Sequence, residues 1–316
     1  MNRKVWLIGA GQMAVDYFKV LKALGISCIV IGRSETSAKV FFDKTGDMPI
    51  IGGLYSFIKT NPSKCTHAII SVGVNYLSKV TIKLLNYNIK NILVEKPAGL
   101  NIDEIQSILN LTKKKKANVF VGYNRRFYSS VRKAKEIIKS DGGLLSLKFD
   151  FTEWTDTIMS LDIDRKIKNK WLIANSTHVI DLAFFMGGEP EKIYSNTSGS
   201  LEWHPTASIF SGSGITKNGI LFSYSANWES AGRWSLHLET PKRKLIFEPI
   251  EKLKRQNKGS LKIEEISGIN YELDTKYKPG LFLQVDQFLK NNIDRDLIDI
   301  SCHSNFYKIY YKIGNY

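Results

Sequence analysis

The first 124 residues alternate between short apolar runs and longer stretches in which apolar residues recur at helical spacing. The apolar runs predict strands at Val5–Ile8, Ser27–Ile31, His67–Val72, Asn91–Glu95 and Asn118–Tyr123. The stretches between them predict amphipathic helices at Ala14–Leu24, Glu35–Phe42, Leu77–Leu85 and Ile102–Thr112. Alternation at this spacing is typical of βαβ units, so we expect a doubly wound parallel sheet with helices on both faces.

The pattern changes from about Leu144, where longer strand-like runs are separated by turn residues. These runs are Leu145–Thr152, Ala207–Phe210, Ile220–Ala226 and Trp234–Glu239. They predict a mostly antiparallel sheet, to which helices near Ser176–Met186 and Leu281–Asn291 are added. We expect an α/β chain of two domains, 1–124 and 125–316, with the second an α+β domain and no flexible linker at Asn124–Arg126.

Lysine dominates the charge of the chain. The 316 residues include 45 Lys and Arg against 30 Asp and Glu, and the resulting net charge of +15 invites a nucleic-acid or anionic-membrane interpretation. Only 10 of the basic residues are Arg, whose planar fork reads phosphates and bases, and no recognition motif accompanies the charge. Residues 1–124 hold 17 basic and 7 acidic side chains. We expect no nucleic-acid partner, and a surface that attracts anionic small molecules.

The densest basic run, Lys113–Lys116, follows the predicted helix Ile102–Thr112. Asn101 is placed to cap that helix, and Asp103 and Glu104 fall in its first turn. The lysines therefore complement the negative end of the helix dipole, and a solvated helix end is the interpretation we favour over a nucleic-acid surface or a general attraction for anions.

Other features of the chain point to a cytoplasmic protein. Cys28, Cys65 and Cys302 are widely spaced and odd in number, as expected of reduced thiols. The chain lacks a signal-peptide pattern at Met1–Lys4 and any apolar stretch of about 18 residues, so we expect no membrane partner. The five His form no ligand-spaced pair with Cys, and we expect no metal site.

The sequence Gly9-Ala10-Gly11-Gln12-Met13-Ala14 is a G-x-G-x-x-A turn between the first predicted strand and helix. Gly9 permits a tight turn, Gly11 allows a pyrophosphate close to the backbone, and Ala14 allows the helix and strand to pack closely. The helix N-terminus supplies free N–H groups for the diphosphate. We therefore expect Gly9, Gly11, Gln12 and Met13 to bind a dinucleotide; the alternative is a glycine turn without a ligand.

The end of the second predicted strand bears on cofactor selectivity. An NAD site usually has an acidic residue there for the ribose 2′-hydroxyl, but this chain has Arg33 and Ser34, and Glu35 already begins the next helix. Arg33 can clamp a 2′-phosphate and Ser34 can donate to it, so we expect NADP in preference to NAD. Alternatively, Arg33 is a loop residue that stacks on adenine.

Two further motifs follow predicted strands, at the edge where open α/β sheets hold their ligands. Glu95-Lys96-Pro97 ends the strand Asn91–Glu95, and Tyr123-Asn124-Arg125-Arg126-Phe127 ends the strand Asn118–Tyr123. A lysine just past a strand, with its backbone restricted by a following proline, is poorly explained by packing.

Glu95-Lys96-Pro97 and the glycine turn together resemble the Gfo/Idh/MocA family of NAD(P)-dependent oxidoreductases, the glucose–fructose oxidoreductase and inositol dehydrogenase group. Tyr123–Phe127 matches a second family segment, and Asn175–Leu182 followed by Gly187 is similar to a third. Tyr277–Gly280 resembles a late, less specific segment. These motifs stand in family order over nearly the whole chain.

The resemblance implies an N-terminal Rossmann domain and a C-terminal domain with a large open-faced sheet, which often forms the interface of a homo-oligomer, a dimer or tetramer. It also implies roles for named residues. Lys96 would hold the reacting hydroxyl and the nicotinamide ribose, with Glu95 beside the cofactor, and His178 would be the acid/base. The residues expected to bind substrate are Lys96, Tyr123, Asn124, Arg125, Trp171, Asn175 and His178.

Physical arguments support the two catalytic roles. Lys96 is a donor that can stabilise a developing alkoxide. His178 falls in the first turn of a predicted helix, where the dipole disfavours imidazolium. Asp181, three residues later, lies on the same face and either orients the ring or opposes that effect.

One departure from the family pattern concerns Ala174, which stands where family members commonly have Asp. Asn175 follows and can bond a substrate hydroxyl but cannot take a proton. Either Lys96 and His178 suffice, or the chemistry is altered, or the fold survives as a binding module.

Aromatic residues of the second half are further candidates for a sugar pocket, or alternatively pack in the core. They are Trp154, Trp171, Trp203, His204, Trp228 and Trp234. We expect an NAD(P)-dependent oxidoreductase acting on a secondary alcohol or ketone of a sugar, preferably a nucleotide-activated sugar in surface-glycan biosynthesis. The alternatives are a free sugar or inositol dehydrogenase and a non-catalytic cofactor or sugar sensor.

Overall fold

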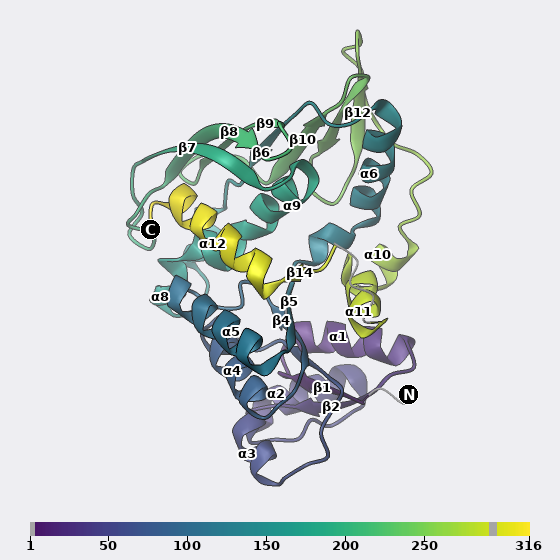
Figure 1. The fold of residues 1–316 in the computed structure, drawn as a ribbon, viewed down its shortest axis with the longest axis vertical. Helices are drawn as coiled ribbons and strands as arrows, with labels where there is room; N and C mark the ends of the chain where they lie inside the picture. The colour runs from purple at the N-terminus through teal and green to yellow at the C-terminus, as the bar shows by residue number, and fades with distance from the viewer. Residues whose placement is uncertain (1–3, 291–295) are drawn as a thin grey trace. The chain divides into compact units, whose positions relative to one another are not determined.

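The chain forms two compact units in the computed structural model, which describes residues 4–290 and 296–316 (Figure 1). The first unit consists of the chain through Asn124 together with Leu273–Ser304, and the second of Arg125–Glu272 together with Asn305–Tyr316. The division after Asn124 coincides with the expected domain boundary, whereas Leu273–Ser304 joins the first unit instead of the second.

A six-stranded sheet with the order β14-β5-β4-β3-β1-β2 forms the centre of the first unit. Its strands are β1 Lys4–Ile8, β2 Ser27–Ile31, β3 His67–Ile70, β4 Asn91–Glu95, β5 Asn118–Gly122 and β14 Ile298–Asp299. Strands β1 to β5 pair in parallel, as predicted, and β14 joins β5 in antiparallel orientation. Strand β3 ends at Ile70, two residues before the predicted end at Val72, which leaves Ser71 and Val72 in the loop at the carboxyl edge.

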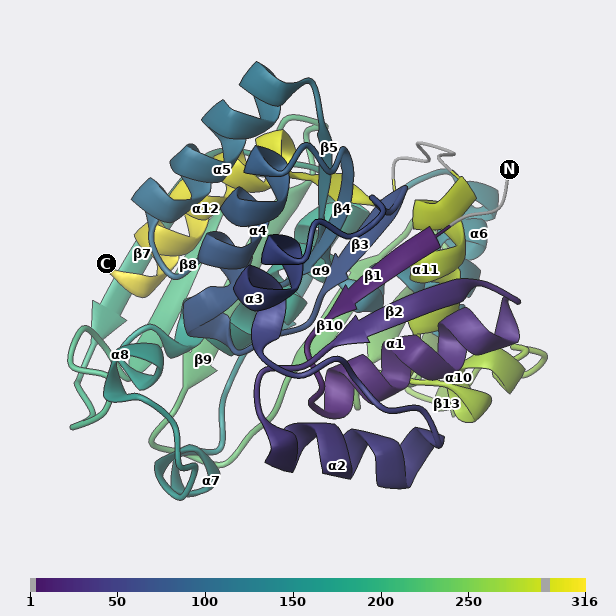
Figure 2. The ribbon, with the colours of Figure 1, turned by 90° about the horizontal axis from the view of Figure 1, so that it is seen from below.

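Helices cover both faces of this sheet (Figure 2). Helices α1 (Gln12–Ala23), α2 (Glu35–Thr45) and α11 (Leu281–Lys290) lie on one face, and α4 (Leu77–Asn86) packs against α5 (Ile102–Lys115) on the other. The shorter α3 (Gly53–Lys59) and α10 (Glu272–Lys276) were not predicted. The final residue of the predicted helix Leu281–Asn291 lies outside the described residues.

The predicted caps of α5 are confirmed. The Asn101 side chain accepts from the backbone N–H of Glu104 at 2.9 Å, and Lys113, Lys114 and Lys115 occupy the last turn. Opposite charges thus lie at the two ends of the helix, as its dipole favours. The basic run is a helix terminus, in agreement with the interpretation that needs no nucleic acid.

The second unit contains an eight-stranded sheet with the order β13-β12-β11-β10-β6-β9-β8-β7. Its strands are β6 Ser146–Asp150, β7 Pro190–Ser198, β8 Ile209–Thr216, β9 Leu221–Asn227, β10 Ser235–Glu239, β11 Arg243–Phe247, β12 Lys254–Asn257 and β13 Ile263–Glu265. All pairs are antiparallel except β6 with β9. The mostly antiparallel sheet is therefore confirmed, although the predicted strand Ala207–Phe210 begins at Ile209 and continues to Thr216.

The two faces of this sheet differ in polarity. Leu147 and Phe149 of β6 are buried on the face against which α9 (Thr177–Gly187) packs. On β9, Phe222 and Tyr224 are buried, while the alternating Ser223 is exposed on the opposite face. Period-two alternation of this kind leaves one face of an antiparallel sheet open. The remaining helices are the 3-10 turns η1 Val74–Tyr76 and η2 Asn124–Phe127, α6 Ser129–Asp141, α7 Thr155–Met159, α8 Arg165–Lys168, the π-helical turn η3 Leu172–Ser176 and α12 Ile300–Gly314. Helix α12 belongs to both units.

Candidate functional site

The glycine turn lies at the carboxyl edge of the first unit's sheet, between β1 and α1. Gly9 has φ +125°, and its N–H donates to the carbonyl of Ile31 at 2.9 Å. A Cβ at Gly9 would lie 2.4 Å from the Ser71 carbonyl oxygen, so only glycine fits there. Gly11 precedes α1 without a side-chain cap, and a Cβ there would meet no atom within 4 Å. The first turn of α1 therefore presents free N–H groups to a ligand that can approach the backbone.

A cleft of about 460 Å³ opens beside this turn, within the first unit. It is lined by Ile8, Gly9, Ala10, Gly11, Ile31, Arg33, Ser34, Ser37, Gly52, Gly53, Leu54, Tyr55, Ser71, Val72, Gly73, Tyr76 and Val80. The glycine cradle, the helix N-terminus and the size of the cleft fit part of a nicotinamide dinucleotide, with the glycine turn facing its diphosphate.

Arg33 and Ser34 lie on the wall of the cleft. The Arg33 guanidinium carbon lies 4.9 Å from the ring centre of Tyr76. Ser34 caps α2, since its hydroxyl oxygen accepts from the backbone N–H of Ser37 at 3.3 Å and lies 2.9 Å from the Ser37 hydroxyl. Ser37 and Tyr76 were missed from the sequence. Ser37 has a detectable signal, because it stands three residues after a helix cap, but Tyr76 has none.

Two other predicted cofactor residues do not line the cleft. The amide of Gln12 donates to Asp16 at 3.0 Å and accepts from Lys44 at 2.6 Å, so this side chain lies along the surface of α1 and α2. Met13 is partly buried and is also absent from the cleft wall. Their backbone N–H groups remain in the first turn of α1, which is where a diphosphate would meet them.

A buried hydrogen-bond network surrounds the end of β4. The Tyr17 hydroxyl, fully buried on α1, donates to the Glu95 carboxylate at 2.6 Å, and its oxygen lies 3.4 Å from Gln284 Oε1. A Cβ at Gly122, which pairs with Glu95 across β4 and β5, would lie 3.3 Å from both the Glu95 and the Tyr17 oxygens. Neither Tyr17 nor Gly122 was singled out as a site residue from the sequence.

Neighbouring groups stabilise the negative charge of the Glu95 carboxylate. Burial raises the pKa of the Glu95 carboxyl, and the Tyr17 hydrogen bond and the positive charges of Lys96 and Lys278 act in the opposite direction. Burial, together with the neighbouring carboxylate, raises the pKa of Tyr17 well above 10, so this hydroxyl remains a donor. Glu95 is thus held as a fixed partner beside Lys96 at the carboxyl edge of the sheet.

Tyr123 and Asn124 follow β5 in the same unit and are both buried. The Tyr123 ring lies 5.7 Å from the His303 ring, and His303 Nε2 lies 3.0 Å from the Pro97 carbonyl oxygen. The Asn124 amide donates to the Pro279 carbonyl at 2.9 Å. Three of the segments that resemble the Gfo/Idh/MocA family, those around Lys96, Tyr123 and Pro279, therefore lie in one region of the first unit.

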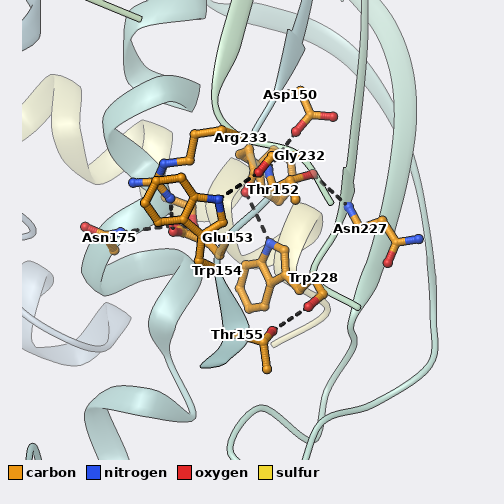
Figure 3. A network of polar contacts seen from close by, with 12 residues as sticks. Asp150, Thr152, Glu153, Trp154, Thr155, Asn175, Asn227, Trp228, Gly232 and Arg233 are labelled. Carbon is orange, nitrogen blue, oxygen red and sulfur yellow. Dashed lines mark hydrogen bonds and ion pairs between the residues drawn. The ribbon is translucent and has the colours of Figure 1, made fainter. Parts of the chain in front are cut away.

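In the second unit, Glu153 is the centre of a polar network (Figure 3). This carboxylate is 2% exposed and accepts from Ser176 Oγ at 2.7 Å, Asn175 Nδ2 at 3.0 Å and Arg233 at 2.8 Å. Burial raises the pKa of Glu153, and these three donors oppose the increase. Asn175 and Ser176 belong to the π-helical turn η3, a feature that often occurs at functional sites.

His178 lies in α9 directly after η3, which changes one expectation. Because η3 runs into α9 without a break, His178 is inside a continuous helical segment and not at a free helix N-terminus. The helix-dipole argument for a neutral ring is therefore wrong for this residue. The His178 ring is 8% exposed, and its centre lies 6.2 Å from the indole of Trp234.

Both carboxylate oxygens of Asp181 are held by Arg126. Arg126 Nε donates to Asp181 Oδ2 at 2.7 Å and its NH2 group donates to Oδ1 at 2.6 Å. Burial raises the pKa of Asp181, and the guanidinium opposes that increase. This buried bidentate pair links the segment after β5 to α9.

The remaining aromatic candidates separate into two groups. Trp203 and Trp228 stack at 5.6 Å, and the buried His204 contacts both and bonds to the Ala207 carbonyl and the Tyr316 hydroxyl, so these three pack in the core. Trp171 packs edge-on against Trp203 at 6.4 Å. In contrast, the indoles of Trp154 and Trp234 contact Arg233.

The predicted site residues thus form three local groups. Gly9, Gly11, Arg33 and Ser34 line the nucleotide cleft; Glu95, Lys96, Tyr123 and Asn124 follow β4 and β5; and Arg125, Trp171, Asn175 and His178 belong to the second unit. Among the described residues, no three His, Cys, Asp or Glu side chains gather where they could hold a metal ion. Over those same parts of the chain, no helix is long and apolar enough to cross a membrane.

Residues 3–123 match the model of the Gfo/Idh/MocA "Oxidoreductase family, NAD-binding Rossmann fold". Over 118 residues the chain is 29% identical to YceM of Salmonella typhimurium, a match that covers 37% of this chain and 35% of that protein. The chain therefore spans about a third of the length of this curated relative.

Solved structures share the fold over almost the whole chain. Levoglucosan dehydrogenase in complex with NADH and L-sorbose is 16% identical, with a TM-score of 0.79, over 99% of this chain and 96% of that one. UDP-N-acetylglucosamine 3-dehydrogenase from Acidithiobacillus ferrooxidans is 11% identical, with a TM-score of 0.73, over 99% and 97%. An oxidoreductase from Agrobacterium radiobacter in complex with NAD+, L-tartaric acid and magnesium is 12% identical, with a TM-score of 0.75, over 98% and 94%.

Proposed function

Because residues 3–123 belong to the NAD-binding domain of the Gfo/Idh/MocA oxidoreductase family, we propose that the protein moves a hydride between a nicotinamide cofactor and a secondary alcohol or ketone of a sugar. The observation that carries the proposal is the glycine-lined cleft at the end of β1, in the same sheet whose β4 ends at Glu95 and Lys96. A nicotinamide cofactor supplies the hydride chemistry when bound. The chain's own residues bind it, orient the sugar and exchange the proton.

In this proposal Lys96 stabilises the developing alkoxide as a hydrogen-bond donor, and His178 exchanges the hydroxyl proton. Asn175, held by Glu153 at 3.0 Å, has a side-chain carbonyl with which to orient a sugar hydroxyl. Tyr123, Asn124 and Arg125 complete the proposed substrate residues. In this proposal the Tyr17 hydrogen bond holds the Glu95 carboxylate in place next to Lys96.

NADP is the proposed cofactor. Arg33, Ser34 and Ser37 lie on the wall of the cleft, whereas Glu35, the nearest acidic residue, is in the first turn of α2 and does not line it. Replacing Arg33 with alanine should weaken NADPH binding about 10- to 100-fold and NADH binding by much less, because only the 2′-phosphate loses a charge-assisted partner. Equal losses for the two cofactors, measured by fluorescence titration, would favour stacking of Arg33 on adenine.

The proposed substrate class is a nucleotide-activated sugar of surface-glycan biosynthesis. The fold shared with a UDP-N-acetylglucosamine 3-dehydrogenase and the basic surface support this choice. A free sugar or inositol dehydrogenase is the alternative, supported by the fold shared with levoglucosan dehydrogenase. Homo-oligomerisation through the open face of the second sheet and a cytoplasmic location also stay predictions.

Nicotinamide absorbance during incubation with a panel of sugars tests the function. Replacing Lys96 with methionine should leave cofactor binding largely intact but reduce turnover about 100-fold or more, as expected when a donor to a developing oxyanion is removed. Replacement of the exposed Lys79 on α4 with methionine is the matched control. Unaltered turnover in the Lys96 variant would contradict its role. Binding of sugars without turnover across the whole panel would support the alternative of a non-catalytic cofactor or sugar sensor.

A further inference from the structure

Two guanidinium groups of the second unit contact one indole ring. Trp234, immediately before β10, is 3% exposed. The guanidinium carbon of Arg233 lies 4.4 Å from its ring centre and that of Arg125 lies 4.8 Å from it. His178 contacts the same indole. The guanidinium groups of Arg125 and Arg233 and the ring of His178 therefore all contact the Trp234 indole.

Three side chains contact the Arg233 guanidinium. Its guanidinium carbon lies 4.4 Å from the ring centre of Trp234 and 4.6 Å from that of Trp154, and one of its amino groups donates to Glu153 at 2.8 Å (Figure 3). Trp154 is itself fixed, because its indole N–H donates to the Gly232 carbonyl at 3.0 Å. Because 40% of the Arg233 side chain is still exposed, a planar group with five donors presents its remaining edge to solvent in a fixed orientation.

Arg125 differs from Arg233 in having no carboxylate partner among the described residues. Its Nε is buried and makes no hydrogen bond within the part of the chain that the structure describes. Glu153 balances the charge of Arg233, so the pair of guanidinium groups retains one uncompensated positive charge. A partly buried charge in this situation is stabilised by an anion that also satisfies its free donor.

We propose that Arg125 and Arg233 form an oxyanion-binding subsite of the second unit, which takes a carboxylate or phosphate group of the substrate. The forked donors of arginine match both groups in a bidentate manner, and the indoles hold the forks against rotation. This inference rests on the proposed function, because the oxyanion is part of the sugar derivative on which that reaction acts. It assigns these two arginines to the anionic group of that sugar derivative and disfavours a neutral free sugar as the substrate.

Binding of matched sugars provides the test. The full-length protein saturated with NADPH is titrated calorimetrically with D-glucose, D-glucuronate, D-glucose 6-phosphate and UDP-glucose; a reduced cofactor with alcohol substrates gives no turnover. We expect at least one anionic compound to bind about 10-fold or more tighter than glucose. Which of the three binds best identifies the source of the oxyanion: a sugar carboxylate, a phosphate ester or a diphosphate.

Variants show whether these arginines are responsible. Arg125→Gln and Arg233→Gln should each reduce the ratio of anionic-sugar to glucose affinity about 10-fold or more. Arg125→Lys, which keeps the charge without the fork, should retain part of it, and Arg132→Gln on the exposed surface of α6 is the matched control. Equal binding of charged and neutral sugars, no binding of any anionic sugar at millimolar concentration, or an unchanged preference in both glutamine variants would overturn the inference.

These experiments distinguish failure of the proposed oxyanion subsite from failure of the proposed oxidoreductase function. Turnover of a neutral sugar without any preference for anions overturns the subsite and leaves the oxidoreductase function intact. A preference for anions that depends on Arg125, accompanied by no turnover of any sugar in the absorbance assay, supports the subsite and overturns the proposed reaction.

Discussion

Replacing Tyr17 with phenylalanine removes one hydroxyl from the buried end of β4 and leaves the aromatic ring in place. In the native protein that hydroxyl donates to Glu95 at 2.6 Å. The close approach of Gly122 leaves little room for the carboxylate to find another partner. A hydrogen bond to a charged group contributes about 1.5–3 kcal/mol, so we expect the free energy of unfolding of the first unit to fall by about 2 kcal/mol at pH 8.

The loss should depend on pH. Burial raises the pKa of Glu95 above 4.5, and the Tyr17 hydroxyl counteracts part of that increase. Between the pKa of the unfolded chain and that of the folded protein, the folded state binds more protons than the unfolded state, so stability decreases as the pH rises. Without the hydroxyl the folded pKa rises further and this window extends to higher pH. The variant should therefore be closest to the native protein near pH 4.5 and fall further below it at pH 8.

Hydrogen exchange of the β1 and β4 amides measures the free energy of opening of this unit between pH 5 and pH 8. Tyr55→Phe is the matched control, because Tyr55 is 53% exposed on α3 of the same unit and its change should alter stability by less than about 0.5 kcal/mol. If Tyr17→Phe behaves as Tyr55→Phe does, or loses the same free energy at every pH, the Tyr17–Glu95 bond does not stabilise the carboxylate as argued.

Two further predictions concern the second unit. Arg126→Met should cost about 3–5 kcal/mol by leaving the buried Asp181 unpaired, whereas adding Asp181→Leu should restore most of the loss; equal melting temperatures for the single and double variants would refute this. Burial lowers the pKa of His204 from 6.5 to about 4, so the unfolded chain binds the extra proton first as the pH falls, and stability should drop by up to about 3 kcal/mol between pH 6.5 and pH 4. Ring resonances of His204 that titrate near pH 6.5 in the folded protein would contradict the latter.

Local patterns were sufficient for the parallel strands of the first unit. Strands β2 and β4 have the predicted bounds, because each is a short apolar run whose neighbours cannot extend it. In the second unit, β7 was missed since Pro190–Ser198 is mostly polar and gains its place by pairing with β8 along its length. Strand β14 has two residues and no detectable periodicity of its own.

Among the candidate site residues, too, some have a local sequence signal and others are brought together only by the fold. The glycine turn and Arg33 could be singled out because the signals for them lie in neighbouring residues of the sequence. Tyr17 and Glu95 are 78 residues apart, and Glu153 and Arg233 are 80 residues apart, so only the fold shows that they are partners. Neither pair has a local signal, because a tyrosine on a helix and an arginine in a loop are individually unremarkable.

The substitution at Ala174 has a consequence for the proposed chemistry. Ala174 is 5% exposed within η3 and offers no group for proton transfer. The carboxylate that contacts this turn is Glu153, but its oxygens already accept from Asn175, Ser176 and Arg233. These bonds hold Asn175 and Arg233 in position, so Glu153 serves the proposed reaction as a positioning residue. In that reaction His178 exchanges the proton, and replacement of Glu153 with glutamine should alter substrate affinity more than the pH dependence of turnover.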